Sequence, residues 1–420
     1  MSMRIGYACL TVGVPNTQLR TCILKNANEM VLQGLTQSNL TALDHMLDYN
    51  IKNEIQLLRI SSDIVPFASH PEVEFAWQEL FHEQLASLGE KARNAGMRLS
   101  MHPGQYTVLN SLTDDVVKRA VMDLTYHCRF LDALGMGSEC KIILHVGGAY
   151  GDKKAAIKRF QDNYDLLASS IRQRLVIEND DKIYSIDEVL EIGLDCDIPV
   201  VFDNLHNAVY PSEQQKRESE WIALSSETWK ADDGPQKIHY SQQAEGKRSG
   251  SHSDTISVHE FVNFAPQLPA ACDVMLEVKD KNISAVKCIL ATAKIGKIEK
   301  LEEEWARYKY AVLERSPQNY KAISSLLKDK SSYPVLEFYD LIEKSIGTIS
   351  EPGKAKNAAL HVWGYFKDIA TQSEKRRFES LLEQYREGSA TLQSLKRHLY
   401  RLSEKYRQDY LLQSLYFYDV

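Results

Sequence analysis

Seven histidine, aspartate and glutamate residues in the first two thirds of the chain are of the types that bind divalent metal ions. They are His102, His145, Glu178, Asp203, His206, His239 and Glu277. Neutral imidazole and carboxylate groups suit Zn²⁺, Mn²⁺ and similar ions. Three or four of these side chains would make one metal site, and seven are enough for two or three ions that share carboxylates. Clustered ions commonly hydrolyse phosphodiesters, because one activates water while the others hold the scissile and leaving oxygens.

The elements that must position these residues are short runs rich in β-forming residues, separated by stretches with helical periodicity. The runs cover residues 3–9, 55–61, 98–102, 141–146, 174–179, 199–204, 237–241 and 273–278. The helical stretches between them include residues 74–95, 116–134, 153–170 and 185–194. Strands that alternate with helices predict a parallel sheet, and eight such units predict an α/β fold of the closed (β/α)8 or TIM-barrel type. Because the spacing is uneven, an open doubly wound sheet stays an alternative.

The candidate ligands lie at the carboxyl ends of the expected strands. His102 ends the third run, His145 comes near the end of the fourth, and Glu178 near the end of the fifth. In a barrel these ends meet at one mouth, where active sites form. A single histidine at a strand end is usually hydrogen-bonded or exposed, and a single carboxylate there often caps a helix. Seven such residues in one expected ring instead indicate a metal centre.

Lys237 shares one face of the seventh expected strand with His239, because side chains two residues apart point to the same side. A cationic lysine beside metal ligands is electrostatically unfavourable. It fits if its pKa is depressed, so that it acts as a neutral amine or is carboxylated to a metal-binding carbamate. The alternative is a lysine whose stem leads its charge out through the bottom of the barrel.

The loop that follows the third strand, His102-Pro103-Gly104-Gln105-Tyr106, is suited to probing a nucleic-acid duplex. Pro-Gly sets a tight turn, which projects an amide and an aromatic ring from the mouth. An aromatic ring can replace lost base stacking, and an amide can fill the space or hydrogen-bond to bases. An ordinary turn with one surface tyrosine is the alternative.

Basic residues near the expected mouth are candidates for contacts with phosphates. Lys247 and Arg248 lie in the polar segment 242–252. Further candidates on the helix after the fourth strand are Lys153, Lys154, Lys158 and Arg159. A solvated helix face is the alternative for these four. The net charge of −7 requires a local basic patch if the protein binds DNA.

The composition is typical of a globular protein without a membrane segment. The chain has 420 residues, 44% of them hydrophobic and 25% charged. We find no apolar run of the ~20 residues that a membrane span needs, and the start MSMRIGYACL lacks the features of a signal peptide. Seven scattered cysteines without a CxxC pair indicate reduced thiols. We therefore expect a cytoplasmic protein with no membrane partner.

The character of the sequence changes after Lys281. Amphipathic helical stretches replace the strand pattern and cover residues 284–310, 318–327, 333–345, 355–369, 373–385 and 392–402. The segment SEPGK at 350–354 is expected to be a loop. We predict a barrel domain over residues 1–305 and an all-α domain over residues 306–420. Residues 291–420 carry 22 Lys and Arg against 18 Asp and Glu, so the basic residues are in excess here.

Ordered motifs in the first part of the chain resemble a known family. They are MRIGYACL, RISSDIVPFASH, LSMHPGQYTVLN, ILHVGGAYGDK, LVIENDDK, VVFDNLHN, KIHYSQ, SHSD and MLEVKDK. Over roughly residues 3–285 they resemble the UV damage endonucleases, relatives of endonuclease IV among the xylose-isomerase-like barrels. The resemblance implies two or three bound divalent ions, manganese in the first place, with Zn²⁺, Co²⁺ or Mg²⁺ as alternatives. It implies incision of double-stranded DNA 5′ to cyclobutane pyrimidine dimers, 6-4 photoproducts and abasic sites, leaving a 3′-hydroxyl and a 5′-phosphate.

The same resemblance assigns roles to individual residues. The seven candidate ligands match the family's metal positions, which His70 and His252 extend. Gln105 and Tyr106 match the pair that probes the duplex, and Tyr7 matches a tyrosine that lines the lesion pocket. Lys237 matches a lysine that is carboxylated in the family, and endonuclease IV has an aspartate at the equivalent place. We therefore expect Glu178, Lys237 and His239 to be catalytic and Lys247 and Arg248 to assist in DNA binding.

Residues 306–420 resemble the YbgA-like helical domain, which leaves the partner of this region unassigned. Two other functions stay open from the residues alone. A metal-dependent sugar isomerase or epimerase would use the same ligand ring without the Gln105–Tyr106 pair. A binding module would have a degenerate barrel and a helical part that recruits partners.

Overall fold

Eight parallel strands form a closed barrel in the computed structural model, which describes residues 3–418. The strands are β1 (Ile5–Ala8), β2 (Leu57–Ile60), β3 (Arg98–Met101), β4 (Ile142–His145), β5 (Leu175–Glu178), β6 (Val200–Asp203), β7 (Lys237–Tyr240) and β8 (Asp273–Leu276). Neighbours in the sequence pair in parallel, and β1 pairs with β8 to close the ring. Every strand lies within the range expected from the sequence, so the predicted (β/α)8 barrel is confirmed and the open sheet is wrong.

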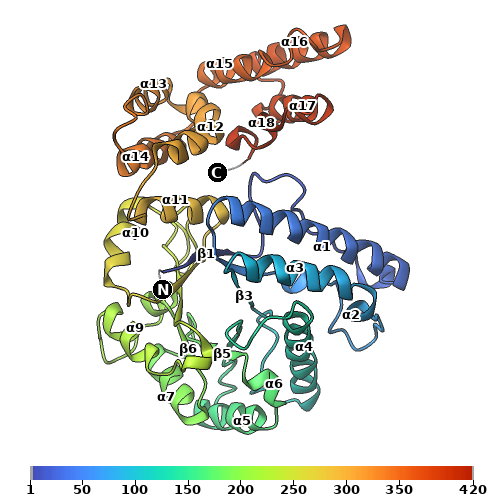
Figure 1. The fold of residues 1–420 in the computed structure, drawn as a ribbon, viewed down its shortest axis with the longest axis vertical. Coiled ribbons are helices and arrows are strands. Elements are labelled where there is room, and N and C mark those ends of the chain that lie inside the picture. The colour runs from blue at the N-terminus through green and yellow to red at the C-terminus, as the bar shows by residue number, and fades with distance from the viewer. Residues whose placement is uncertain (1–2, 419–420) are drawn as a thin grey trace. The chain divides into compact units, whose positions relative to one another are not determined.

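Helices surround the strands (Figure 1). Those of the barrel are α1 (Glu29–Lys52), α2 (Trp77–Leu80), α3 (His82–Asn94), α4 (Asp114–Ala133), α5 (Lys153–Asp165), α6 (Ser169–Arg172), α7 (Ile186–Cys196), α8 (Asn204–Val209), α9 (Glu218–Ser226) and, after β8, α11 (Asn282–Thr292). Between β7 and β8 the chain also forms α10 (Val258–Phe264), which belongs almost entirely to the second compact unit described below. Because these helices cover the outside and side chains fill the inside, the strand residues are almost all buried.

The alternation of side chains along each strand decides which residues reach the mouth. Ile143, Val176 and Val201 pack together from neighbouring strands β4, β5 and β6. The residues two positions further along these strands share the same face. They are His145, Glu178 and Asp203. The packed apolar layer therefore supports a polar layer directly at the carboxyl ends of the strands.

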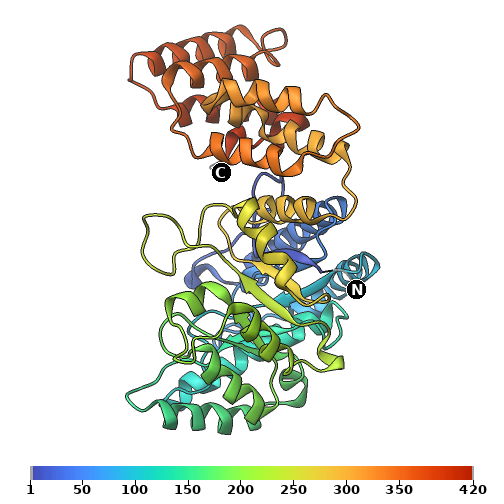
Figure 2. The ribbon, with the colours of Figure 1, turned by 90° about the vertical axis from the view of Figure 1, so that its left-hand side faces the viewer.

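Only helices occur among the described residues after α11 (Figure 2). They are α12 (Ile298–Arg315), α13 (Pro317–Leu326), α14 (Val335–Ile346), α15 (Pro352–Trp363), α16 (Gln372–Arg386), α17 (Leu392–Lys405) and α18 (Asp409–Leu412). No helix in the described part of the chain is long and apolar enough to cross a membrane.

Two expectations about these helices are wrong. The single helix expected over 284–310 is interrupted between α11 and α12, where a Cβ on Gly296 would lie 2.0 Å from the ring of Tyr333. Glycine permits this close approach, and its cost within a helix favours the break. The loop expected at 350–354 is instead the start of α15, with Pro352 in the first turn. Proline suits that position because the missing N–H would have no helical partner.

The described chain divides into two compact units. Residues 3–11, 16–256 and 264–286 form the first, and residues 12–15, 257–263 and 287–418 form the second. The expected boundary between residues 305 and 306 falls within α12. The chain passes from the first compact unit to the second for the last time between Val286 and Lys287. The position of a functional domain boundary stays a prediction.

Candidate metal centre

Glu178 lies at the centre of the polar layer, at the end of β5. Its Oε1 is 2.7 Å from His239 Nδ1 and 3.7 Å from His206 Nδ1. Its Oε2 is 3.2 Å from His102 Nε2 and 3.7 Å from His145 Nε2. Burial by itself would raise the pKa of Glu178, but His239, His145 and His102 hold it well below the usual value. The carboxylate is therefore ionised, and each of its two oxygens faces the rings of two histidines.

Asp203 and His206 are joined by the start of α8. The Asp203 side chain accepts a hydrogen bond of 2.7 Å from the His206 backbone N–H and caps this helix. Burial raises the pKa of Asp203 to about 6. Burial would lower the pKa of His206, but the carboxylates of Asp203 and Glu178 raise it to about 9. Both pKa values are thus raised, that of Asp203 by burial and that of His206 by the neighbouring carboxylates.

Glu277 completes the ring on the β8 side. Its Oε1 is 3.2 Å from His239 Nδ1, and its Oε2 is 3.9 Å from His252 Nε2. Arg59, on β2, forms a short ion pair with Glu277. Burial would raise the pKa of Glu277, but Arg59 and His239 hold it well below the usual value. Sequence reasoning missed Arg59, although its position two residues after the inward-facing Leu57 could have indicated it.

The residues present fit divalent metal ions. Two sets of three residues each offer possible ligand atoms that lie within 4.8 Å of one another. The first set is His102, His145 and Glu178, and the second is Glu178, Asp203 and His239. Asp203 Oδ2, His239 Nε2 and His145 Nδ1 are buried without a hydrogen-bond partner in the described structure. Buried polar atoms are rarely left unpaired, so such atoms next to a charged cluster call for a ligand. Imidazole and carboxylate atoms are ligands that suit divalent ions such as Zn²⁺ and Mn²⁺.

Lys237 lies inside the barrel, fully buried, two residues before His239 on β7. Its Nζ has no hydrogen-bond partner within residues 3–418. Burial, followed by the charge of Arg98, lowers the pKa of Lys237 well below its usual value. The alternative in which the stem leads the charge out through the barrel bottom is therefore wrong, because the ammonium position is enclosed. A neutral amine or a modified amine fits this environment.

Gln105 and Tyr106 lie on the rim between two cavities. Gln105 lines the mouth cavity of about 680 Å³ together with His102, Glu178 and Arg59. Tyr106 is 74% exposed and lines a second cavity of about 510 Å³. A Cβ on Gly104 would lie 2.4 Å from the Tyr106 ring, so the ring passes closely over the backbone of this glycine. The pair therefore projects from the rim, as the Pro-Gly turn predicted.

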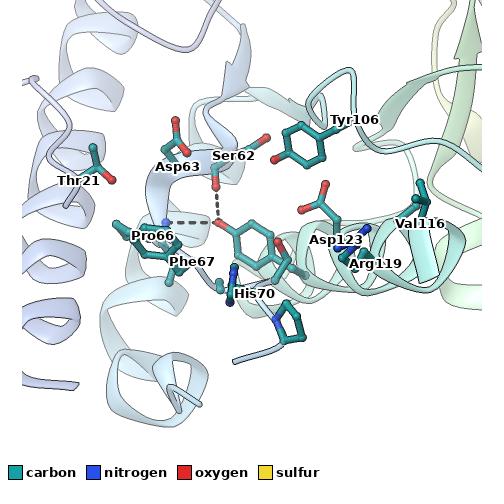
Figure 3. A pocket seen from close by; sticks show the side chains of 16 residues that line it. Thr21, Ser62, Asp63, Pro66, Phe67, His70, Tyr106, Val116, Arg119 and Asp123 are labelled. Atoms are coloured by element: carbon teal, nitrogen blue, oxygen red, sulfur yellow. Dashed lines mark hydrogen bonds between the residues drawn. The ribbon is translucent and has the colours of Figure 1, made fainter. Parts of the chain in front are cut away.

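His70 is not brought to the metal cluster. It lines the second cavity with Tyr106 and Asp123, where Figure 3 shows Phe67 beside it. Its Nδ1 accepts a hydrogen bond of 3.2 Å from the Glu72 backbone. The structure contains no grouping of His70 with the other possible ligands among the described residues. The described residues therefore do not bring His70 to the other candidate ligands, and its expected role as a metal ligand stays a prediction.

Tyr7 does not reach either cavity. Its side chain is fully buried, and its hydroxyl donates a hydrogen bond of 2.9 Å to Asn50 on α1. Ala8, the next residue, packs inside the barrel with Leu57 and Met275. Since neighbouring side chains alternate, Tyr7 points outward to the helices. Tyr7 therefore does not line either cavity, and its expected role in a lesion pocket stays a prediction.

The basic residues differ in their availability. Lys247 and Arg248 are exposed in the loop between β7 and α10, whose base is fixed by a bridge between Gln243 and His252. On α5, Lys153 pairs with Glu188 at 2.8 Å, and Lys158 pairs with Asp162 at 2.8 Å. Arg159 donates to the Asn110 carbonyl at 3.0 Å. Lys247 and Arg248 are therefore better placed to bind phosphate than the three α5 residues, whose charged groups already have partners.

A polar contact behind His102 also escaped sequence reasoning. Ser62 Oγ donates a hydrogen bond of 3.1 Å to the His102 carbonyl and lies 2.8 Å from His127 Nε2. His127 is fully buried on α4, and its Nδ1 lies 2.7 Å from the Asp123 carbonyl. These contacts fix the backbone from which the Pro-Gly turn begins. In the sequence, only the polar Ser-Ser-Asp segment directly after β2 indicated that side chains there could form such contacts.

The fold and this mouth define a class, the metal-dependent (β/α)8-barrel enzymes. The model of a family described as UV-endonuclease UvdE matches residues 3–333. The chain belongs to this family and is an endonuclease of DNA repair. A second family, described as a protein of unknown function (DUF1722), matches residues 309–419. The resemblances to the UV damage endonucleases and to the YbgA-like domain are confirmed.

Individual relatives agree with this assignment. A UV DNA damage endonuclease from Clostridium perfringens is 38% identical over 387 residues, which cover 91% of this chain and 92% of that protein. One from Bacillus cereus strain Q1 is 35% identical over 280 residues, 66% of this chain and 88% of that protein. The crystal structure of SacUVDE is 38% identical with a TM-score of 0.65 and covers 68% of this chain and 96% of that one. The sugar isomerase and the degenerate binding module are therefore not supported.

Proposed function

We propose that this endonuclease incises double-stranded DNA 5′ to cyclobutane pyrimidine dimers, 6-4 photoproducts and abasic sites. It leaves a 3′-hydroxyl and a 5′-phosphate and uses two or three divalent ions, in the first place Mn²⁺. The observation that carries this proposal is the position of the exposed Gln105–Tyr106 pair on the rim of the cavity that contains Glu178. A probe for base stacking and a site for hydrolysis lie next to each other.

The residues of the mouth would act on one phosphate of the strand. Glu178, Asp203 and Glu277 supply the negative charge, and the histidines around them supply neutral nitrogen ligands. Bound divalent ions would activate water and stabilise the charge that develops on the phosphate oxygens. Arg59 keeps Glu277 ionised and in place. Lys247 and Arg248 would contact neighbouring phosphates without reading sequence.

Recognition of damage would depend on how readily the duplex unstacks. A photoproduct stacks poorly, so the Tyr106 ring and the Gln105 amide enter there at lower cost than in an intact duplex. The cavities on both sides of the rim leave space for displaced nucleotides. Neither residue reaches the position of the metal ligands in the polar layer, so the probing and cutting roles are separable by mutation.

The test compares duplexes with one photoproduct, one abasic site or no damage, in Mn²⁺ and in EDTA. We expect a single nick 5′ to each lesion in Mn²⁺ and none in EDTA. The variant Gln105→Ala/Tyr106→Ala should lower incision by at least about 10-fold while its metal content stays unchanged. Leu166→Ala, an exposed apolar residue on the barrel surface, is the matched control. Cutting of intact DNA at the same rate, or cutting in EDTA, contradicts the proposal.

Lys237 would become a carbamate. The neutral amine attacks carbon dioxide, an N–C bond forms and a proton leaves, so a carboxylate replaces an unpaired Nζ. The enclosed position next to His239 favours this state, because a carbamate can bind the ions that an ammonium would repel. Intact-protein mass spectrometry should show a gain of one carbon dioxide that is absent in Lys237→Met. Full metal content and incision in Lys237→Met would remove this role.

We also propose a division into functional domains and a cellular location. The separate functional domains would cover residues 1–305 and 306–420, although the folded units divide elsewhere. A cytoplasmic location accords with the seven free cysteines, because reduced thiols persist in that compartment. Localisation of a tagged chain by cell fractionation tests the second proposal, and enrichment in a membrane or extracellular fraction contradicts it.

A further inference from the structure

The helical second unit contains a groove that the nuclease function does not use. Its volume is about 470 Å³, within the range of about 300–1,000 Å³ that is usual for ligand sites. Its lining consists of Glu302, Trp305, Ala306, Lys309, Tyr320, Ser324, Leu327, Lys328, Lys330 and Tyr410. These residues come from α12, α13, the turn after α13 and α18. Aromatic rings and lysines thus dominate the groove.

The aromatic rings of the groove are fixed by contacts with one another. The Trp305 and Tyr320 ring centroids are 5.3 Å apart, with their planes at 50°. Tyr410 stacks on Tyr365 with centroids 5.9 Å apart, and its hydroxyl donates to the Ala306 carbonyl at 3.1 Å. Tyr410 is nevertheless 36% exposed. The Tyr410 ring is therefore held in place while part of its surface stays accessible to a ligand.

The lysines of the groove are not equally neutralised. Lys330 forms a short ion pair with Glu302 and donates to the Leu327 carbonyl at 2.8 Å. Among residues 3–418, no carboxylate lies within ion-pair distance of Lys309 or Lys328. Lys309 Nζ lies 4.8 Å from the ring centroids of both Tyr310 and Tyr410, and burial lowers its pKa. Lys309, which lies over the Tyr410 ring, and Lys328, which lines the same groove, therefore lack a counter-charge among the described residues.

We propose that this groove binds single-stranded nucleic acid, with a base against Trp305, Tyr320 or Tyr410 and phosphate against Lys309 and Lys328. Aromatic platforms flanked by lysines are the usual means of holding unpaired strands, because every base offers a flat face. A duplex would fit less well, since its bases are stacked on each other. An acidic peptide would use the lysines but leave the rings without a partner. The excess of basic residues over residues 291–420 favours the same anionic ligand.

The test uses the full chain, in EDTA, with a fluorescein-labelled oligothymidylate as the probe. All variants carry Gln105→Ala/Tyr106→Ala, so that binding at the barrel rim is weakened. We expect Lys309→Gln/Lys328→Gln to raise the Kd about 10-fold and to reduce the salt slope by about 1.4, the value for two lost contacts with a single strand. Tyr410→Leu should weaken binding without changing the salt slope. Lys367→Gln/Arg376→Gln, exposed residues of the same unit, are the charge-matched control and should have no effect.

Several results would overturn this inference. They are an unchanged Kd in the groove variants, no binding of the strand by the Gln105→Ala/Tyr106→Ala chain, and an equal loss in the control variant. Competition by polyglutamate as strong as that by the oligonucleotide would assign the groove to acidic peptides instead. Competition by thymidine monophosphate at the same concentration as the strand would assign it to free nucleotides. Circular dichroism melting of each variant shows whether it is folded, and Tyr410→Leu provides an independent reading if the lysine variant is not.

Discussion

At the scale of single residues, the mouth depends on how buried charges compensate one another. Glu178 is surrounded by imidazoles, and Glu277 is held between His239 and the guanidinium of Arg59. A buried charge that loses its partner is strongly destabilising, whereas an exposed pair contributes little. A divalent ion can replace a missing cation. The residues of the mouth should therefore affect stability differently with and without metal.

Arg59→Met tests this compensation. We expect it to lower the free energy of unfolding by about 3–5 kcal/mol in EDTA, because Glu277 then lacks its cation. The loss should be smaller in Mn²⁺, where a bound ion takes over that role. Urea unfolding under both conditions measures the two values. Lys118→Met, which removes an exposed pair with Asp115, should change stability by less than about 1 kcal/mol. Equal losses for Arg59→Met in EDTA and Mn²⁺ would contradict the compensation.

At the scale of elements, helices approach each other closely at defined glycines. A Cβ on Gly89 in α3 would lie 1.6 Å from the carbonyl oxygen of Leu134, which follows α4. Backbone atoms cannot give way as a flexible side chain can, so this contact requires a residue without a Cβ. Gly34 in α1 is the opposite case, since nothing lies within 4 Å of its ideal Cβ. The same residue type thus has a packing role in one helix and none in another.

Gly89→Ala and Gly34→Ala form a matched pair. The first should destabilise the barrel by about 2–4 kcal/mol, because α3 must move away from the end of α4. The second should stabilise it by about 0.5–1 kcal/mol, because alanine has the higher helix propensity. Thermal or urea unfolding of the two variants measures both changes. A neutral Gly89→Ala would mean that α3 can shift without cost, and a destabilising Gly34→Ala would reveal an unrecognised contact.

At the scale of the whole molecule, metal binding and folding are linked. The mouth brings together residues at the ends of β3 to β8, and these candidate ligands approach one another only when the barrel is closed. An ion that binds the folded chain alone stabilises it by RT ln(1 + [L]/Kd), about 2.7 kcal/mol at a hundredfold excess over Kd. Metal should therefore stabilise the barrel as a unit.

Titration with Mn²⁺ should raise the melting temperature of the full chain by a few degrees, and EDTA should reverse the rise. Glu178→Gln should abolish most of this shift and lower bound metal measured by elemental analysis, because the shared carboxylate is lost. Its incision should fall at least about 100-fold. Glu191→Gln, on the exposed face of α7, is the matched control and should keep the shift. A full shift in Glu178→Gln would exclude this carboxylate as a ligand.

The sequence by itself determined the barrel and most of the ligand ring. Strand and helix periods are local properties, so all eight strands were located before any contact was known. The period of two along a strand also linked His239 to Lys237 and placed both inside. Because the carboxyl ends of parallel strands meet at one mouth, His102, Glu178 and Asp203 were expected together, and the structure groups Glu178 with His102 in one set and with Asp203 in another.

Only the tertiary structure decided which residues are neighbours across the barrel. The distances around Glu178 and the pairing of Arg59 with Glu277 join strands far apart in the chain, and no local pattern encodes them. The same holds for the positions of two residues to which the motifs assigned roles. Tyr7 lies one residue out of phase with the inner face, and His70 follows a turn away from the mouth. The groove of the helical unit likewise exists only because α12, α13 and α18 pack together, since side chains distant in sequence form one surface only after folding.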